Sequence, residues 1–83
     1  MRLDKFLKVS RVIKRRTLAN ELCDQGHVSV NGRVAKAGIE IKPGDILEVR
    51  FGHRMQKLEI VDVRENVPAK LAAELYKLLE ETT

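Results

Sequence analysis

The chain has 83 residues, which is enough for one domain but too few for two domains that each bury a core. Apolar residues make up 43% and charged residues 34%, as in a folded protein with a strongly ionised surface, and the net charge is +4 at pH 7. The lone Cys23 excludes an internal disulfide and cannot build a zinc site by itself. No apolar run approaches a membrane span, and charges between residues 2 and 8 interrupt any signal-peptide core. We therefore expect a cytoplasmic protein with no membrane partner.

The charge is unevenly distributed along the chain. Residues 1–16 carry seven Arg or Lys and one Asp, a net charge of +6, whereas the net charge is +1 for residues 17–57 and −3 for residues 58–83. A scattered surplus of basic groups would only keep a small protein soluble. This concentration predicts one end that faces a polyanion and one end that faces away from it.

The first predicted helix begins near Leu3. Leu3, Phe6 and Leu7 have the i, i+3, i+4 spacing of a helix with one buried stripe. Successive residues of a helix are turned by about 100°, so the face opposite this stripe is almost purely cationic, and Asp4 is its only negative charge. We expect Asp4 to cap the helix or to pair with a nearby arginine, and not to act in catalysis. The cations of this face are Arg2, Lys5 and Lys8.

The segment 11–16, RVIKRR, is predicted to link this helix to a second one, with Val12 and Ile13 anchoring the turn in the core. Its last three cations stand where a second helix begins, and repulsion from the helix dipole costs roughly several tenths of a kcal/mol for each. A chain that tolerates such a cost usually places an anion there, so this helix start is a predicted phosphate site. The cations of the segment are Arg11, Lys14, Arg15 and Arg16.

The second helix is predicted from about Arg15 or Thr17 to Gln25, with Gly26 as its C-terminal stop. Its outer face is predicted to carry Asn20, Glu21 and Asp24 and so to repel phosphate, and nucleic acid should therefore approach the N-terminal end of the helix. That argues against a recognition helix in a DNA major groove. The buried stripe is predicted to be Leu18, Ala19, Leu22 and Cys23, the last as a small core residue.

Residues 27–36, HVSVNGRVAK, are predicted to form a hairpin. Two valines alternate with a serine, Asn31-Gly32 supplies the positive φ angles of a type I′ turn, and Val34 should return on the buried face. Arg33 and Lys36 add cations near the loop. The period-two pattern continues at Ile39 and Ile41.

Two further strands and a final helix are predicted in the second half of the chain. The strands cover residues 46–51 and 55–64, with a break at Gly52-His53. Pro68 suits the first turn of a helix that should cover the sheet or, alternatively, hold a protein partner. The apolar stripe of this helix is predicted to be Leu71, Leu75, Leu78 and Leu79.

No residue set for catalysis or cofactor binding is present in the sequence. There is no Gly-rich phosphate loop, no credible nucleophile with a base, no isolated carboxylate pair and no metal-ligand spacing. We therefore expect neither an enzyme nor a cofactor. Phe6 and Phe51 fit core positions, so a platform for base stacking is not expected, and binding should rest on phosphates and RNA shape.

The segments RLDKFL, KRRTLANEL, QGHVSVNGRVAKAG and IKPGDILEV resemble the S4-type RNA-binding domain. The resemblance covers residues 1–51, and residues 52–83 are expected to complete the same single domain as a C-terminal extension. It implies an α+β fold in which two N-terminal helices, arranged like a helix–turn–helix, pack on a small, mostly antiparallel sheet. The C-terminal helix is expected from the sequence pattern alone. One departure is Arg15, since many members of the family have a serine there that caps the second helix.

Within that family the chain is most similar to the short stand-alone members of the RqcP family, which act in bacterial ribosome quality control. The resemblance implies a protein that binds rRNA on stalled large subunits that carry peptidyl-tRNA, with this tRNA as a second expected partner. There it would support C-terminal alanine tailing by an RqcH-type quality-control factor. We expect the protein to be a monomer. A ribosome-recycling RNA binder of the heat-shock type and a small DNA-binding regulator are the alternatives.

The RNA-binding residues predicted from this reasoning position the protein on phosphates without reading base sequence. Most contacts are assigned to Arg2, Lys5, Arg11, Lys14, Arg15 and Arg16, with Lys8, Arg33 and Lys36 at the margin.

Overall fold

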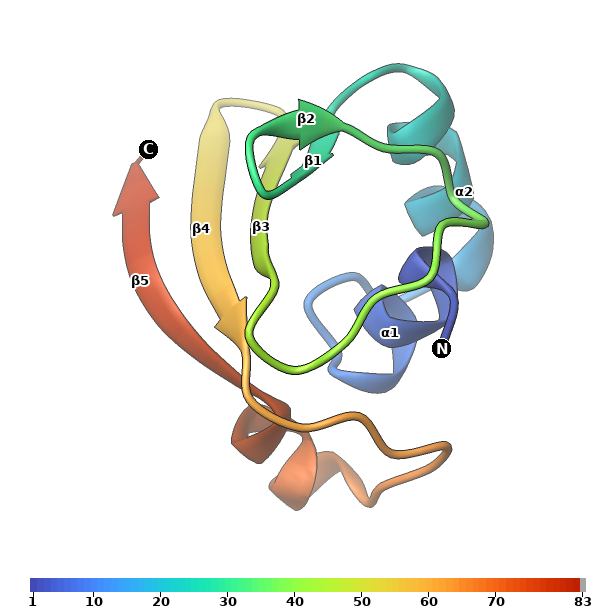
Figure 1. Cartoon of the computed structure of the whole chain (residues 1–83), viewed down its shortest axis with the longest axis vertical. Helices are drawn as coiled ribbons and strands as arrows, with labels where there is room; N and C mark the ends of the chain where they lie inside the picture. The colour runs from blue at the N-terminus through green and yellow to red at the C-terminus, as the bar shows by residue number, and fades with distance from the viewer. Residues whose placement is uncertain (83) are drawn as a thin grey trace.

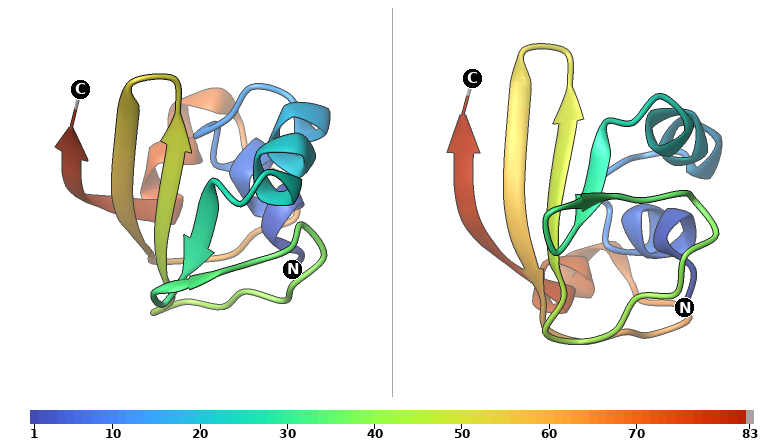
Figure 2. Two further views of the ribbon diagram at one scale, coloured as in Figure 1. Left: turned by 90° about the horizontal axis from the view of Figure 1, so that it is seen from above. Right: turned by 45° about the horizontal axis from the view of Figure 1, so that its top comes forward.

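The computed structural model describes residues 1–82 and has the predicted α+β architecture. Two helices lie on one face of a curved five-stranded antiparallel sheet of order β2-β1-β3-β4-β5, and a short 3₁₀ helix lies near one end of the sheet (Figure 1). Figure 2 shows the same two layers from two further directions. The elements are α1 (Leu3–Val9), α2 (Arg16–Asp24), β1 (Val28–Val30), β2 (Arg33–Val34), β3 (Ile46–Phe51), β4 (Arg54–Ile60), η1 (Ala69–Leu75) and β5 (Tyr76–Thr82).

The core lies between the two helices and the inner face of the sheet. The predicted stripe of α1 is confirmed, since all three of its apolar side chains are fully buried. Alternate residues of β3 and β4 meet this stripe, because side chains two apart on a strand share a face. The buried residues that α1 and these strands contribute are Leu3, Phe6, Leu7, Leu47, Val49, Leu58 and Ile60.

The C-terminal end of α2 is capped as predicted. Gly26 has φ +79°, its N–H donates to the carbonyl of Cys23, and the N–H of His27 donates to that of Leu22. This pair of hydrogen bonds is the Schellman motif, which needs a residue in the left-handed region and so favours glycine. The motif ends α2 and turns the chain directly into β1.

The turn between β1 and β2 is also confirmed, with positive φ at Asn31 (51°) and Gly32 (84°). The Asn31 side chain ties this turn to the start of β3, because its Oδ1 accepts from the Ile46 N–H at 2.9 Å. Its Nδ2 donates to the buried Asp45 carboxylate at 3.1 Å. The hairpin is therefore braced against the next strand by side-chain hydrogen bonds as well as by the ladder.

The prediction that Val34 is buried is wrong. Val34 is 67% exposed, and Ala35 turns inward instead. The register pairs Val34 with Ser29, so Val34 shares the outer face of the sheet with that serine and not the inner face with Val28. The predicted buried stripe of α2 is confirmed at Ala19, Leu22 and Cys23. It is wrong at Leu18, which is 44% exposed.

Residues 35–45 cross the molecule as a loop beside the N-terminus of α1. The N–H groups of Leu3 and Asp4 donate to the carbonyls of Ile39 and Ala37, at 2.9 and 3.1 Å. The predicted period-two pattern holds at Ile41, which is buried, but fails at Ile39, which is 43% exposed. This segment makes only an isolated bridge with residue 2, so it has no continuous ladder to impose alternation.

The predicted strand of residues 55–64 is shorter than expected and ends at Ile60. The predicted C-terminal helix exists only as η1, and its extension through Leu78 and Leu79 is wrong. Residues 76–82 instead form β5, which pairs with β4 in antiparallel register around an irregularity at Lys57 and Leu58. The open edge of β4 exposes a row of backbone donors and acceptors, and pairing with β5 satisfies them. The hydrogen bonds gained by pairing with β4 stabilise a strand at Leu78 and Leu79 more than their helical spacing stabilises a helix.

Candidate nucleic-acid interface

The N-termini of the two helices meet at a buried carboxylate, Asp4. Asp4 lies in the first turn of α1 and its side chain is only 3% exposed. Arg2 contacts it through Nε at 3.2 Å, and Arg16 at the start of α2 contacts it through Nε at 3.3 Å. Asn20, one turn further along α2, donates to Oδ2 at 3.5 Å. We call Arg2, Asp4, Arg16 and Asn20 the Asp4 cluster.

Asp4 is ionised in this cluster. Burial raises the pKa of the carboxyl group, but hydrogen bonds from Arg16 and Asn20 and the charges of Arg16 and Arg2 outweigh it. The pKa of Asp4 therefore lies below its ordinary value of 3.8. The expectation that Asp4 pairs with an arginine is confirmed, and it pairs with two that come from different elements.

The two arginines keep hydrogen-bonding capacity for a ligand. Arg2 donates to Asp4 through Nε and Nη2, and Arg16 donates through Nη2 while its Nε forms an ion-pair contact. At least three of the five N–H donors of each guanidinium remain for a ligand. The side chains are 52% exposed for Arg2 and 46% for Arg16. A shallow hollow of about 430 Å³ lies beside Arg16, and its other lining residues are Asp4, Thr17, Asn20 and Glu21. The cluster thus presents two oriented guanidinium groups to solvent.

The turn between the helices is anchored as predicted, with Ile13 buried and Val12 half-buried. Arg11 follows the end of α1 and has φ +63°, in the left-handed region that is unfavourable for a residue with a Cβ. The Ile13 N–H then donates to the Leu7 carbonyl at 3.1 Å and closes the turn. As a result Arg11 and Lys14 are exposed on either side of the apolar anchor.

α2 begins without a side-chain cap, as expected from the arginine at position 15. Arg15 is the N-cap residue, it is exposed, and no side chain caps the free N–H groups of the first turn. Arg15 and Arg16 therefore stand beside uncapped donors, which is the arrangement that binds a phosphate. The flank of the same helix exposes Glu21 and Asp24, in agreement with approach from the N-terminal end.

The remaining predicted binding residues differ in their surroundings. Lys5 is paired with Glu65, from the segment before η1, whereas Lys8 lies half-buried on α1. Lys36 is exposed in the loop that bonds to the N-terminus of α1, so the fold brings it near Asp4. Arg33 is exposed in β2 at the edge of the sheet. Within residues 1–82, the predicted binding residues outside any ion pair are Lys8, Arg11, Lys14, Arg15, Arg33 and Lys36.

We use the name cationic surface for Arg2 and the exposed basic residues of the interhelical turn. The fold joins them because the Asp4 cluster ties residue 2 to the start of α2, where the turn ends. The cationic surface consists of Arg2, Arg11, Lys14, Arg15 and Arg16.

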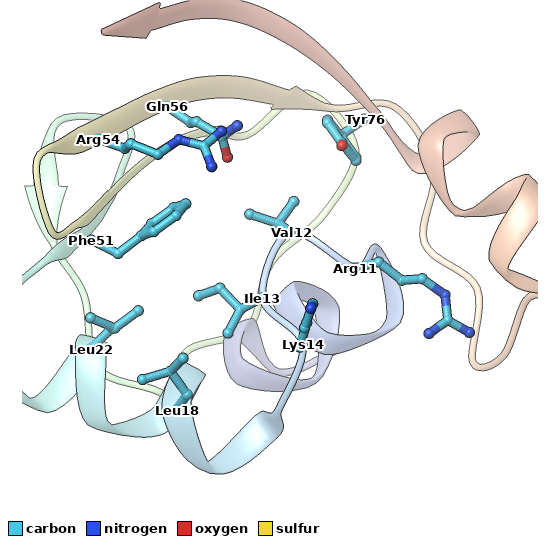
Figure 3. A pocket seen from close by; sticks show the side chains of 10 residues that line it. All are labelled: Arg11, Val12, Ile13, Lys14, Leu18, Leu22, Phe51, Arg54, Gln56 and Tyr76. Atoms are coloured by element: carbon cyan, nitrogen blue, oxygen red, sulfur yellow. The ribbon is translucent and has the colours of Figure 1, made fainter. Parts of the chain in front are cut away.

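Sequence reasoning missed Arg54, which lies across a groove from the interhelical turn. Its guanidinium carbon is 5.3 Å from the centre of the Phe51 ring, a cation–π contact between the ends of β3 and β4. Figure 3 shows Arg54 and Gln56 on the sheet side of this groove and Leu18 and Leu22 on the α2 side. Arg54 follows the predicted break at Gly52-His53, and only the strand register Phe51–Arg54 places it over the ring.

Among residues 1–82, no group of three or more His, Cys, Asp or Glu side chains could hold a metal ion. Burial, with the nearby charges of Asp4 and Asp24, raises the pKa of the Cys23 thiol to about 11. Cys23 is therefore an unreactive core residue, as expected. None of the helices formed by these residues is long and apolar enough to cross a membrane.

Comparison with known proteins links this geometry to a family. Residues 1–47 match the S4 domain. The RQC P-site tRNA stabilizing factor of Halalkalibacterium halodurans is 57% identical over 81 residues, which cover 98% of this chain and 92% of that protein. The factor of the same name from Bacillus subtilis is 52% identical over 81 residues, which cover 98% and 94%.

A solved structure shares the fold. The trimeric structure of Vibrio cholerae Heat Shock Protein 15 superimposes with a TM-score of 0.89 at 31% sequence identity, over 95% of this chain and 81% of that chain. The similarity therefore extends beyond residues 1–47 to the strands and the 3₁₀ helix that follow.

Proposed function

Because the chain belongs to the S4-domain family and, within it, to the RQC P-site tRNA stabilizing factors, we propose that it stabilises P-site tRNA in ribosome-associated quality control. The family resemblance expected from the sequence is confirmed, and the family is one of RNA-binding proteins without enzymatic activity. The finer proposal is that the cationic surface binds the rRNA of a large ribosomal subunit, so that the protein braces a tRNA without chemistry of its own.

The observation that carries this proposal is the buried carboxylate that holds Arg2 and Arg16. Two guanidinium groups from different elements are fixed by one anion, and each keeps donors for phosphate oxygens. Fixing them before binding lowers the entropy lost when the RNA docks. The exposed Lys14 and Arg15 extend the positive charge toward the uncapped first turn of α2. An oriented pair of arginines beside a helix N-terminus suits the spaced phosphates of a folded RNA.

Such an interface positions the protein and does not read base sequence, since its donors point at phosphates. Binding should therefore depend strongly on salt. If six phosphates are engaged, the logarithm of the affinity should fall against the logarithm of salt with a slope of roughly −4, at about 0.7 for each contact. A slope near zero would contradict an electrostatic interface.

The partners we propose follow from the location of the charges. Large-subunit rRNA binds the cationic surface, with Lys5 and Lys8 on α1 and Arg33 and Lys36 at its margin. Peptidyl-tRNA in the P site of the stalled subunit is the second RNA, and an RqcH-type factor adds the C-terminal alanine tail. Residues 52–83, which include the acidic end of the chain, would face away from the phosphates. We propose that the protein works in the cytoplasm as a monomer.

The test is gradient sedimentation of the tagged protein from cell extract, with peptidyl-tRNA probed in each fraction. We expect enrichment in free large subunits that carry peptidyl-tRNA, and loss of alanine tails when the protein is deleted. Protein that stays at the top of the gradient at low salt would contradict the proposal.

A role in ribosome recycling of the heat-shock type is the second candidate, because the shared fold with Heat Shock Protein 15 extends over nearly the whole chain. The same gradient separates the two roles. In recycling, deletion would leave peptidyl-tRNA on large subunits without changing the alanine tails of stalled products.

A further inference from the structure

The groove beneath Arg54 adjoins the cationic surface, with which it shares Arg11 and Lys14. It has a volume of about 420 Å³ and lies between the interhelical turn and the inner face of β3 and β4 (Figure 3). Its lining is Arg11, Val12, Ile13, Lys14, Leu18, Leu22, Phe51, Arg54, Gln56 and Tyr76.

The apolar part of this groove is more open than the rest of the core. Leu18 stands on the predicted buried stripe of α2 but is 44% exposed, and Phe51 on the inner face of the sheet is only half-buried. Other inner-face residues of β3, Leu47 and Val49, are fully buried. The two layers therefore separate at this end, and they leave an aromatic ring and a leucine facing an open space.

The rim of the groove is cationic, which decides the kind of occupant it fits. Lys14 on the turn and Arg54 on the sheet are both exposed, and Arg11 extends outward from the same turn (Figure 3). The carboxylate that approaches the groove is Glu81, which already accepts hydrogen bonds from Arg54 and Gln56. An apolar peptide would gain nothing from these cations, whereas a nucleotide combines an apolar, planar base with a phosphate.

We propose that the groove takes one unpaired nucleotide of the large-subunit rRNA. The base would lie against Leu18 and Phe51 and stack with the planar guanidinium of Arg54. Its phosphate would lie toward Lys14, where the groove meets the cationic surface. The inference rests on the proposed function, since it needs rRNA on that surface, and it adds a contact that recognises an unpaired base.

The direct test is photo-cross-linking on purified large subunits that carry peptidyl-tRNA. Leu18 is replaced by p-azidophenylalanine, which its exposure allows, and Val61, 52% exposed and outside the groove, is replaced in the matched control. We expect the position-18 probe to cross-link to a single unpaired rRNA nucleotide, mapped by arrest of reverse transcription. The position-61 probe should give no cross-link to that nucleotide.

A second measurement compares affinities for the same subunits. Phe51→Leu keeps apolar volume but removes the ring that packs against the base and holds Arg54 by a cation–π contact, so we expect about fivefold weaker binding or more. Leu18→Asn should weaken binding severalfold, and Val61→Asn should leave it unchanged. The salt dependence should keep its slope in all three variants, because no phosphate contact has been removed. Circular dichroism and thermal unfolding verify that each variant folds.

The possible outcomes separate this inference from the proposed function. Co-sedimentation with large subunits, together with no cross-link above the position-61 control, would overturn the groove assignment and leave the function standing. A cross-link to tRNA or to a ribosomal protein would overturn the choice of rRNA. Failure of the unmodified protein to bind large subunits would overturn both.

Discussion

Two carboxylates at opposite ends of the chain accept hydrogen bonds from arginine in different surroundings. Asp4 is buried between the two helices and pairs with Arg2 and Arg16. Glu81 lies on the exposed edge strand β5 and pairs with Arg54. A pair that water can reach exchanges its partners freely and contributes little, whereas a buried carboxylate depends on its partners to stay ionised. The N-terminal pair can therefore fix two arginines in place, and the C-terminal pair cannot.

Asp4→Asn should have the largest effect on stability. The change leaves two arginines beside a neutral, buried amide. We expect the free energy of unfolding to fall by about 1–3 kcal/mol, the usual cost of a buried polar group without its hydrogen-bond partner. Urea denaturation at pH 7 measures the change. Asp24→Asn, an exposed carboxylate at the end of α2, is the matched control and should change little. Equal free energies of unfolding for the two variants would contradict a special structural role for the buried Asp4.

The effect of Asp4 should depend on pH in a defined direction. Its pKa is lowered in the folded protein, so the unfolded state binds its proton first as pH falls. The stabilisation is fully present above the ordinary pKa of 3.8 and is lost as pH falls through the lower folded value. The difference in unfolding free energy between the natural protein and Asp4→Asn should therefore be constant from pH 7 to 5 and shrink below pH 4. A difference that grows in acid would contradict an ionised Asp4.

Arg16→Ala should chiefly affect binding. It removes an oriented guanidinium from the Asp4 cluster, and we expect association with large subunits to weaken by about tenfold, as for loss of a charge-assisted contact. The fold should persist, because Arg2 still pairs with Asp4. Lys70→Ala removes an exposed cation of η1 as the control. If Arg16→Ala co-sediments with large subunits like the natural protein, the assignment of Arg16 fails.

Arg11→Gly should separate stability from binding. Glycine adopts φ +63° without the strain that a Cβ causes, so unfolding free energy should rise by about 0.5–1 kcal/mol. Affinity for large subunits should fall severalfold, because one cation leaves the cationic surface. Thermal unfolding and salt-dependent binding measure the two effects. An unchanged affinity would remove Arg11 from the cationic surface.

Glu81→Gln should have the smallest effect. The amide still accepts hydrogen bonds from Arg54 and Gln56, and the lost ion pair is open to water. Thermal unfolding should show no measurable change at pH 7. A clear loss of stability would mean that the exposed ion pair of Glu81 stabilises the fold as the buried pair of Asp4 does.

Much of the N-terminal half follows from local sequence. The spacing of Leu3, Phe6 and Leu7, the glycine after α2 and Asn31-Gly32 are short-range signals, and the structure contains the elements they predict. The second half contradicts such signals at Leu78 and Leu79. Their helical spacing is real, but the unpaired edge of β4 offers backbone hydrogen bonds that no local pattern reveals.

For the binding site, the sequence by itself determined which residues are cations and that they gather within the first sixteen positions, because charge and spacing are properties of the chain. Only the tertiary structure decided how they are held. Packing of α1 against α2 buries Asp4, and that burial makes one carboxylate bind two arginines. Packing also separates the layers at Phe51 and places Arg54 over its ring. Asp4 and Arg16 lie on different helices, and the groove joins the interhelical turn to β3 and β4, so only the folded core brings these residues together.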